Sequence, residues 1–142
     1  MNKIVINLYH IAYFLHTKKI PLLPKLIQYF IRIVFGPYIG IGAKIGKGVW
    51  LLSGGIGVVI NSRAVIGDNV VIRQNVSIGD DGKSLDAPII EDNCNIGAGA
   101  VIIGGIKIGK NSTIGANAVV TKDIPPNSIA VGIPAKVIKT KS

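Results

Sequence analysis

The chain has 142 residues, which suits one domain, and its 49% apolar and 16% charged residues exclude an intrinsically disordered chain. Its 16 Lys and Arg against 7 Asp and Glu give a formal charge of +9, so we expect an anionic partner. The aromatic residues gather near the N-terminus and do not interleave with the C-terminal lysines, so a phosphorylated ligand is favoured over nucleic acid.

The N-terminal segment, residues 1–36, predicts two short helices. Pro21 and Pro24 separate the two apolar runs, and Gly36-Pro37 stops the second. The apolar positions recur at helical spacing and are Ile4, Leu8, Ile11, Ala12 and Leu15, then Leu23, Leu26, Ile27, Phe30 and Val34.

Neither predicted helix can span a bilayer, because Lys18, Lys19, Lys25 and Arg32 interrupt the apolar runs. We expect both helices to pack their apolar faces on the domain that follows. The alternative is a peripheral membrane contact through residues 1–35. The first run is not followed by a small-residue cleavage site, so we predict no signal peptide and a cytoplasmic location.

The second segment, residues 37–142, is built on a repeat of six residues. Its aliphatic positions include Ile66, Ile72, Ile78, Ile90, Ile96, Ile102, Ile108, Ile114 and Val120. A period of six fits neither an α-helix nor a hairpin sheet. It fits a triangular parallel solenoid, in which each hexapeptide gives one short strand and one corner. The aliphatic residue then points inward, and Gly, Asn or Asp takes corners that need a positive φ.

Cys94 occupies a repeat slot that elsewhere holds Val, Ala, Ile or Ser. We therefore interpret it as a small core residue and not as a nucleophile. As the only cysteine it excludes an internal disulfide, and no Cys/His spacing in the chain predicts a metal site.

The repeat is interrupted twice, at residues 51–61 and again at residues 79–88. The second stretch is polar and glycine-rich, as expected of a loop that leaves the coil. Binding residues concentrate on loops of a rigid scaffold, so we expect a site where the two interruptions share a face. The alternative is tolerated loop variation.

The runs VVINSRAVIGDNVVIRQNVSIG and IGAGAVIIGGIKIGKNSTIGANAVVTKDIPPNSIAVGIPAKVI closely resemble the hexapeptide-repeat acyltransferases. Among them the chain is most similar to serine O-acetyltransferases and bacterial polysaccharide O-acetyltransferases, over about residues 39–139. The resemblance implies a left-handed parallel β-helix with a short N-terminal helical segment. It also implies a homotrimer, which agrees with the flat apolar faces that an isolated prism would expose.

The resemblance implies acetyl-CoA as co-substrate, bound along the groove between adjacent subunits. By position, Ala98 and Ala116 would offer backbone groups to the pantetheine arm. Thr121, Lys122, Lys136 and Lys139 match positions near the nucleotide end. Lysines are competent partners for the phosphates of CoA. The alternative for Lys136 and Lys139 is a solvated basic tail.

The histidines that serve as catalytic groups in these relatives are absent at the matching positions. Ser53 and Gly54 replace an Asp-His pair, Asn61 stands where some relatives have a His, and Asp86-Ala87-Pro88 replaces Arg-His-Pro. Ser53 and Asn61 remain as candidate catalytic residues. General-base catalysis typically contributes about 10²–10⁴-fold, so a slower enzyme remains possible.

The first interpretation is therefore an acetyl-CoA-dependent O-acetyltransferase acting on a sugar hydroxyl in surface-polysaccharide synthesis. Serine as acceptor is ranked second because the Asp, His and Arg-His-Pro positions are all changed. The alternative from another class is a non-catalytic trimeric CoA-binding or scaffold protein.

Overall fold

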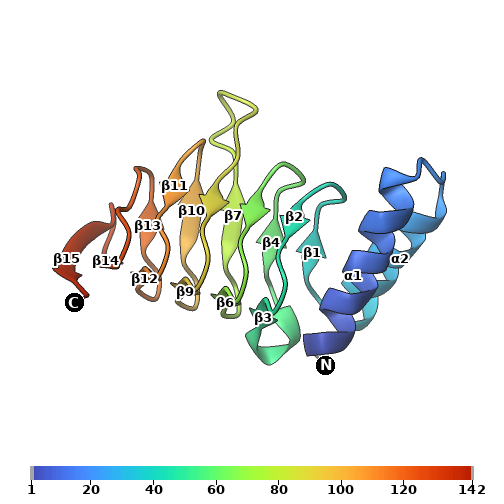
Figure 1. Cartoon of the computed structure of the whole chain (residues 1–142), viewed down its shortest axis with the longest axis horizontal. Coiled ribbons are helices and arrows are strands. Elements are labelled where there is room, and N and C mark those ends of the chain that lie inside the picture. The colour runs from blue at the N-terminus through green and yellow to red at the C-terminus, as the bar shows by residue number, and fades with distance from the viewer. Residues whose placement is uncertain (1, 142) are drawn as a thin grey trace.

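The computed structural model describes residues 2–141, which form two helices followed by a coil of short strands (Figure 1). Helix α1 (Asn2–Thr17) and helix α2 (Leu23–Val34) pack side by side at one end of the coil. Pro24 lies in the first turn of α2, where its missing N–H has no partner to lose. No helix among the described residues is long and apolar enough to cross a membrane.

The coil has three faces, each a sheet in which every third strand of the chain becomes a neighbour. Face A contains β1 (Tyr38–Ile39), β4 (Val59–Ile60), β7 (Ser77–Gly79), β10 (Val101–Ile103) and β13 (Val119–Val120). Face B contains β2 (Lys44–Ile45), β5 (Val65–Ile66), β8 (Ile89–Ile90) and β11 (Lys107–Ile108). Face C contains β3 (Trp50–Leu51), β6 (Val71–Ile72), β9 (Asn95–Ile96), β12 (Thr113–Ile114), β14 (Ser128–Val131) and β15 (Lys136–Thr140).

All strand pairs are parallel except β14 with β15, which closes face C at the C-terminal end. This topology, with the similarity to solved structures given below, confirms the predicted left-handed parallel β-helix with its N-terminal helical segment. We name the corners by the faces they join in chain order: corner AB, corner BC and corner CA.

The interior is one aliphatic column, and the six-residue repeat predicts its members. Each of the aliphatic positions from Ile66 to Val120 named above is at least 98% buried. Cys94 lies among them, and its thiol donates to the carbonyl of Gly109 at 3.3 Å. Burial raises the pKa of this thiol, as expected of the core residue that the sequence predicts.

The corners need left-handed backbone at regular intervals, and asparagine supplies much of it. Asn69, Asn93, Asn111 and Asn127 have φ between 56° and 60° at corner BC. Asn75 and Asn117 do the same at corner CA. A short polar side chain tolerates this conformation better than other side chains do, so the prediction of corners with positive φ is confirmed for Gly and Asn.

Helix α1 caps the first coil and is held by buried contacts. Val5, Ile6 and Ala12 are buried, and the hydroxyl of Tyr9 donates to the carbonyls of Gly40 at 3.0 Å and Ala43 at 2.7 Å. Burial raises the pKa of Tyr9 above its ordinary value, which keeps this hydroxyl a donor. Helix α1 therefore packs on the coil as expected, but largely through another face: of its predicted apolar positions only Ala12 is buried, whereas Ile4 and Ile11 are exposed.

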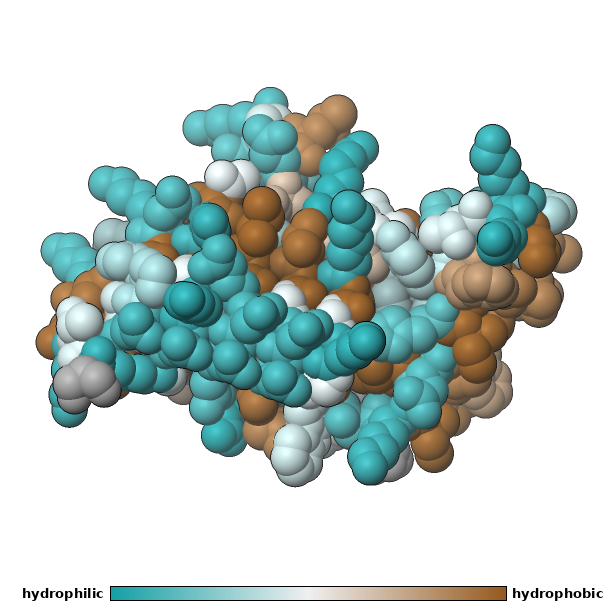
Figure 2. Space-filling view, in the orientation of Figure 1, coloured by the Kyte–Doolittle hydropathy of each residue, from teal (hydrophilic) through white to brown (hydrophobic). Residues whose placement is uncertain are grey.

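For α2 the same expectation is largely wrong. Leu23, Leu26, Phe30 and Val34 are exposed, and among the predicted apolar positions of this helix only Ile27 is partly covered. Helix α2 packs on α1 and on β1 through a different side, which holds its buried residues Pro24 and Ile31, so most of its predicted apolar face stays outside. Figure 2 shows hydrophobic atoms at this helical end of the molecule. A domain boundary at residue 36 stays a prediction.

Candidate functional site

The two interruptions of the repeat border face A from opposite edges. The first contains a 3-10 turn, η1 (Leu52–Gly55), at corner CA between β3 and β4. The second, residues 79–88, leaves corner AB between β7 and β8 and projects from the coil (Figure 1). They therefore share a face, as expected, but the width of face A separates them within one chain.

The first interruption is shaped for glycine. Ser53, Gly54 and Gly55 have φ of 55°, 69° and 84°, three left-handed residues in a row. Gly54 is buried, whereas Ser53 is exposed. A side chain at position 54 would be held in a backbone conformation that L residues rarely adopt. A histidine at position 54 would therefore strain the backbone, even if there were room for its imidazole.

The second interruption is organised around two carboxylates. The side-chain amide of Asn61 donates to Oδ2 of Asp80 at 2.9 Å, and Oδ1 of Asp80 accepts the N–H of Gly82 at 2.9 Å. Oδ1 of Asp81 accepts the N–H groups of Lys83 and Ser84, and these bonds hold the pKa of Asp81 below its ordinary value.

Asn61 is therefore a poor catalytic candidate and a good positioning residue. Its Oδ1 accepts the N–H of Arg63 at 2.9 Å while its Nδ2 holds Asp80, so the amide is engaged at both ends. An amide is not a base, but the carboxylate that it orients is one. Asp80 was not among the residues predicted from the sequence. The available signal was an acidic residue directly after β7, one coil beyond Asn61 at the same corner.

Ala98 and Ala116 are stacked at corner CA. The N–H of Asn117 donates to the carbonyl of Ala98 at 2.8 Å. This stack of corner residues continues toward the first interruption. The N–H of Gly99 donates to the carbonyl of Gln74, and the N–H of Asn75 donates to the carbonyl of Ile56. With strands about 4.8 Å apart, the three steps from Ile56 to Ala116 span about 14 Å, which suits an extended ligand. The structure thus places these two candidates on the edge that carries Ser53.

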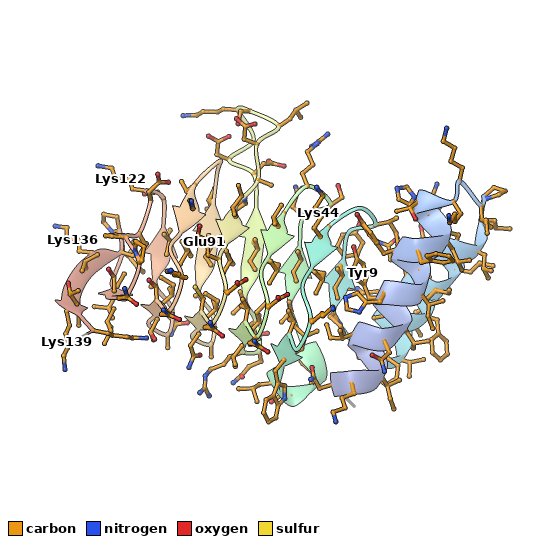
Figure 3. The ribbon with its side chains drawn as sticks, in the orientation of Figure 1. Tyr9, Lys44, Glu91, Lys122, Lys136 and Lys139 are labelled. Atoms are coloured by element: carbon orange, nitrogen blue, oxygen red, sulfur yellow. The ribbon has the colours of Figure 1, made fainter. Side chains whose placement is uncertain are left out.

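The basic candidates lie at the C-terminal end but do not converge. Lys136 pairs with Val131, which leads into corner CA one coil beyond Ala116. Lys139 pairs with Ile129, three residues along β15 toward corner BC, or about 10 Å away. Figure 3 shows Lys122, Lys136 and Lys139 projecting in different directions. Only Lys136 is brought next to the Ala98–Ala116 column.

Thr121 and Lys122 belong to the opposite edge of face A. They follow β13 directly and form the last turn of corner AB, where both are exposed. Corner AB therefore carries Asn61, Asp80, Thr121 and Lys122, while corner CA carries Ser53, Ala98 and Ala116. Within one chain the width of face A keeps the two sets apart.

Three further titratable side chains, His10, Glu91 and Lys107, contact the framework. Nε2 of His10 forms a hydrogen bond of 3.0 Å with the carbonyl of Ile45, so this nitrogen carries the proton. Lys107 Nζ lies 2.9 Å from Glu91 Oε1 on the far side of the coil, and this contact lowers the pKa of Glu91 and raises that of Lys107. Within residues 2–141 no three His, Cys, Asp or Glu side chains form a group that could hold a metal ion.

Comparison with known proteins identifies what this arrangement resembles. A family model described as the hexapeptide repeat of succinyl-transferase matches residues 89–122. The chain is 38% identical to the serine acetyltransferase of Synechococcus elongatus over 132 residues, which cover 92% of this chain and 54% of the relative. It is 46% identical to the chloroplastic serine acetyltransferase 1 of Arabidopsis thaliana over 135 residues, which cover 94% of this chain and 43% of the relative.

Solved structures agree with the sequence matches. The serine acetyltransferase of Neisseria gonorrhoeae superposes with a TM-score of 0.91 at 36% identity, covering 97% of this chain and 54% of that one. A serine acetyltransferase in complex with CoA superposes with a TM-score of 0.87 at 34% identity, covering 94% and 55%. The chain spans about half the length of the relatives it matches.

The resemblance to hexapeptide-repeat acyltransferases, and among them to serine acetyltransferases, is confirmed. The ranking of acceptors is reversed, because these relatives are serine acetyltransferases and none of them supports a sugar hydroxyl. The changed Asp, His and Arg-His-Pro positions, which favoured a sugar acceptor in the sequence, therefore do not separate this chain from the serine acetyltransferases.

Proposed function

We propose that this chain, a hexapeptide-repeat β-helix similar to serine acetyltransferases over nearly its whole length, is an acetyl-CoA-dependent O-acetyltransferase with serine or a similar small hydroxy compound as acceptor. The observation that carries the proposal is the match to a serine acetyltransferase in complex with CoA, which covers 94% of this chain. The stacked small residues at corner CA support it, because they leave room beside the backbone for an extended ligand.

The site we propose lies between two copies of the chain in a homotrimer. The two interruptions of the repeat border the same face from opposite edges, so one chain cannot join them. In a closed ring of three copies, corner CA of each copy can lie beside corner AB of the next. That contact would place Asp80 and Lys122 opposite the Ala98–Ala116 column.

For CoA we propose the groove along corner CA, with Ala98 and Ala116 beside the pantetheine arm. Among the candidate lysines, Lys136 lies nearest to Ala116 along the strand register, so it is assigned to the phosphates. Lys139, and Thr121 and Lys122 of the neighbouring copy, would contribute from farther away. In this assignment the residues bind and orient the thioester, which supplies the acetyl group.

Calorimetry with CoA tests this assignment. Lys136→Ala is expected to weaken binding about fivefold and to flatten its salt dependence, since an exposed ion pair contributes up to about 1 kcal/mol and is screened by salt. Lys139→Ala is expected to have a smaller effect. Lys44→Ala is the control, because Lys44 is exposed on face B far from β15 (Figure 3). Equal affinities for all three variants would refute the placement.

For the missing histidine we propose Asp80 as the general base. The acceptor hydroxyl gives its proton to the Asp80 carboxylate as its oxygen forms a bond to the acetyl carbonyl carbon. The carbon–sulfur bond then breaks, and the departing thiolate takes the proton back. Asn61 holds Asp80 in place through the 2.9 Å hydrogen bond. The N–H of Gly82 fixes the other carboxylate oxygen.

Acetyl transfer to serine, measured by release of free CoA, tests this role. Asp80→Asn is expected to lower kcat by about 10²–10⁴-fold with CoA affinity unchanged, because only the proton acceptor is lost. Asp86→Asn is the control, since Asp86 lies in the same loop and its carboxylate is not engaged by Asn61. Equal activities of both variants would remove Asp80 from the mechanism.

One observation favours a second function, a trimeric CoA-binding protein without turnover. The positions that match the relatives' histidines are Gly54, with left-handed backbone, and Ala87. A chain of this kind would bind CoA in calorimetry and release none from acetyl-CoA in the presence of serine. That pair of results separates the two functions.

A further inference from the structure

The outer side of helix α2 is apolar and uncovered. Leu23, Leu26, Tyr29, Phe30, Ile33 and Val34 have exposed fractions from 46% to 82%. At about 100° per residue these six side chains share an arc of roughly 140°. The helix contacts the rest of the protein on a different arc, which holds its buried residues Pro24 and Ile31. Its apolar face is therefore directed toward something other than the core.

Helix α1 and the connecting turn expose further apolar side chains at the same end of the molecule. Ile4, Ile11 and Phe14 of α1 are 51–58% exposed, and Leu22 of the turn is 68% exposed. We call these side chains, together with the six of α2, the helical apolar surface. Scattered single apolar residues need no explanation, but a cluster of this kind on one short segment marks an interaction surface.

The charge around this surface has one sign. Residues 1–36 contain Lys3, Lys18, Lys19, Lys25 and Arg32, and the first acidic residue of the whole chain is Asp68. Nζ of Lys18 lies 5.5 Å from the ring centroid of Phe14, so cation and apolar group are direct neighbours. On α2, Lys25 and Arg32 lie on the polar arc beside the apolar one.

This combination selects the partner. A second copy would bring five further basic residues against these five, without an acidic residue in the segment to compensate. An anionic lipid bilayer offers a hydrocarbon boundary for the apolar side chains and phosphate groups for the lysines, so it matches both properties of the surface. We infer that α1 and α2 lie on an anionic membrane surface, with the apolar arc of α2 inserted at the boundary between headgroups and acyl chains.

The geometry suits a surface contact and not a crossing. Helix α2 has 12 residues, or about 18 Å at 1.5 Å per residue, which is shorter than the roughly 30 Å of a hydrocarbon core. The coil extends away from the helical end, so the corners that carry Ala98, Ala116 and Asp80 stay in water (Figure 1). The inference does not depend on the proposed acetyl transfer.

Co-sedimentation of the whole chain with vesicles tests the inference. We expect binding to vesicles that contain phosphatidylglycerol and much weaker binding to pure phosphatidylcholine. The variant with Leu26→Ser and Ile33→Ser together should bind at least about tenfold more weakly, since two apolar side chains leave the interface. Lys19→Gln and Lys25→Gln should each lower binding about fivefold and reduce its salt dependence.

Two controls make the outcome decisive. Leu85→Ser removes an apolar side chain that is 69% exposed on the loop of corner AB, far from the helices, and should leave vesicle binding unchanged. Sedimentation equilibrium of the Leu26→Ser, Ile33→Ser variant without lipid should show the wild-type mass. A smaller mass would identify a second copy as the occupant of this surface and overturn the inference. Equal binding of wild type to both kinds of vesicle, or to neither, would overturn it as well.

Discussion

The coil and the helical end use apolar residues in opposite ways. In the coil each aliphatic position of the repeat is buried, because the next coil covers it and its direction is set by the alternation of strand side chains. In α2 the apolar positions are as regular, but most of them face outward. Periodicity therefore predicts which side of an element is apolar. It predicts what covers that side only in a repeat such as the coil, where each turn packs on the next.

The largest expected effect on stability lies in the buried aliphatic column of the coil. Ile96→Ala removes a side chain that is fully buried between β6 and β12 and should lower the free energy of unfolding by about 2–5 kcal/mol. Leu26→Ala removes a side chain that is 52% exposed and should change it by no more than about 0.5 kcal/mol. Denaturant unfolding measures both values. Similar losses for the two variants would mean that the helical apolar surface is covered in solution.

A smaller effect is expected where the coils approach most closely. A Cβ at Gly97 would lie 2.6 Å from the backbone nitrogen of Ala116, so Gly97→Ala must push two coils apart at corner CA. We expect a loss of about 1–3 kcal/mol, the usual result of overpacking. Gly79→Ala is the matched control, since a Cβ there meets no atom within 4 Å.

Thermal melts of the two alanine variants measure this difference. Gly97→Ala, in the regular coil, should lower the melting temperature, whereas Gly79→Ala, at the base of the projecting loop, should leave it unchanged. If Gly97→Ala melts at the same temperature as Gly79→Ala, the close stacking at corner CA has no energetic consequence. The proposal that Ala98 lies beside the pantetheine arm would then lose its structural support, because the proposed groove depends on the same stacking.

The sequence predicted parts of the candidate site and could not predict how they meet. The resemblance to the acyltransferases predicted Ala98, Ala116 and Lys136 as binding residues, and the structure shows that they lie along one edge. The same resemblance predicted Thr121 and Lys122, yet these two residues lie at the other edge of face A. Asn61 was chosen as a possible base, and the structure gives it a different role beside Asp80. That hydrogen bond joins residues on successive coils, and a one-dimensional pattern contains no such pairing.

The sequence by itself determined the coil. A six-residue period allows one inward residue for each strand and one corner between strands, so the parallel solenoid, the buried aliphatic column and the corners with positive φ follow from it, whereas the left hand of the helix came from the family resemblance. Only the tertiary structure decided that the two interruptions lie on opposite edges of face A, and that α2 turns its apolar arc outward. The reason is physical: short-range periodicity fixes the direction of a side chain relative to its own element, whereas what lies opposite it depends on how distant elements pack.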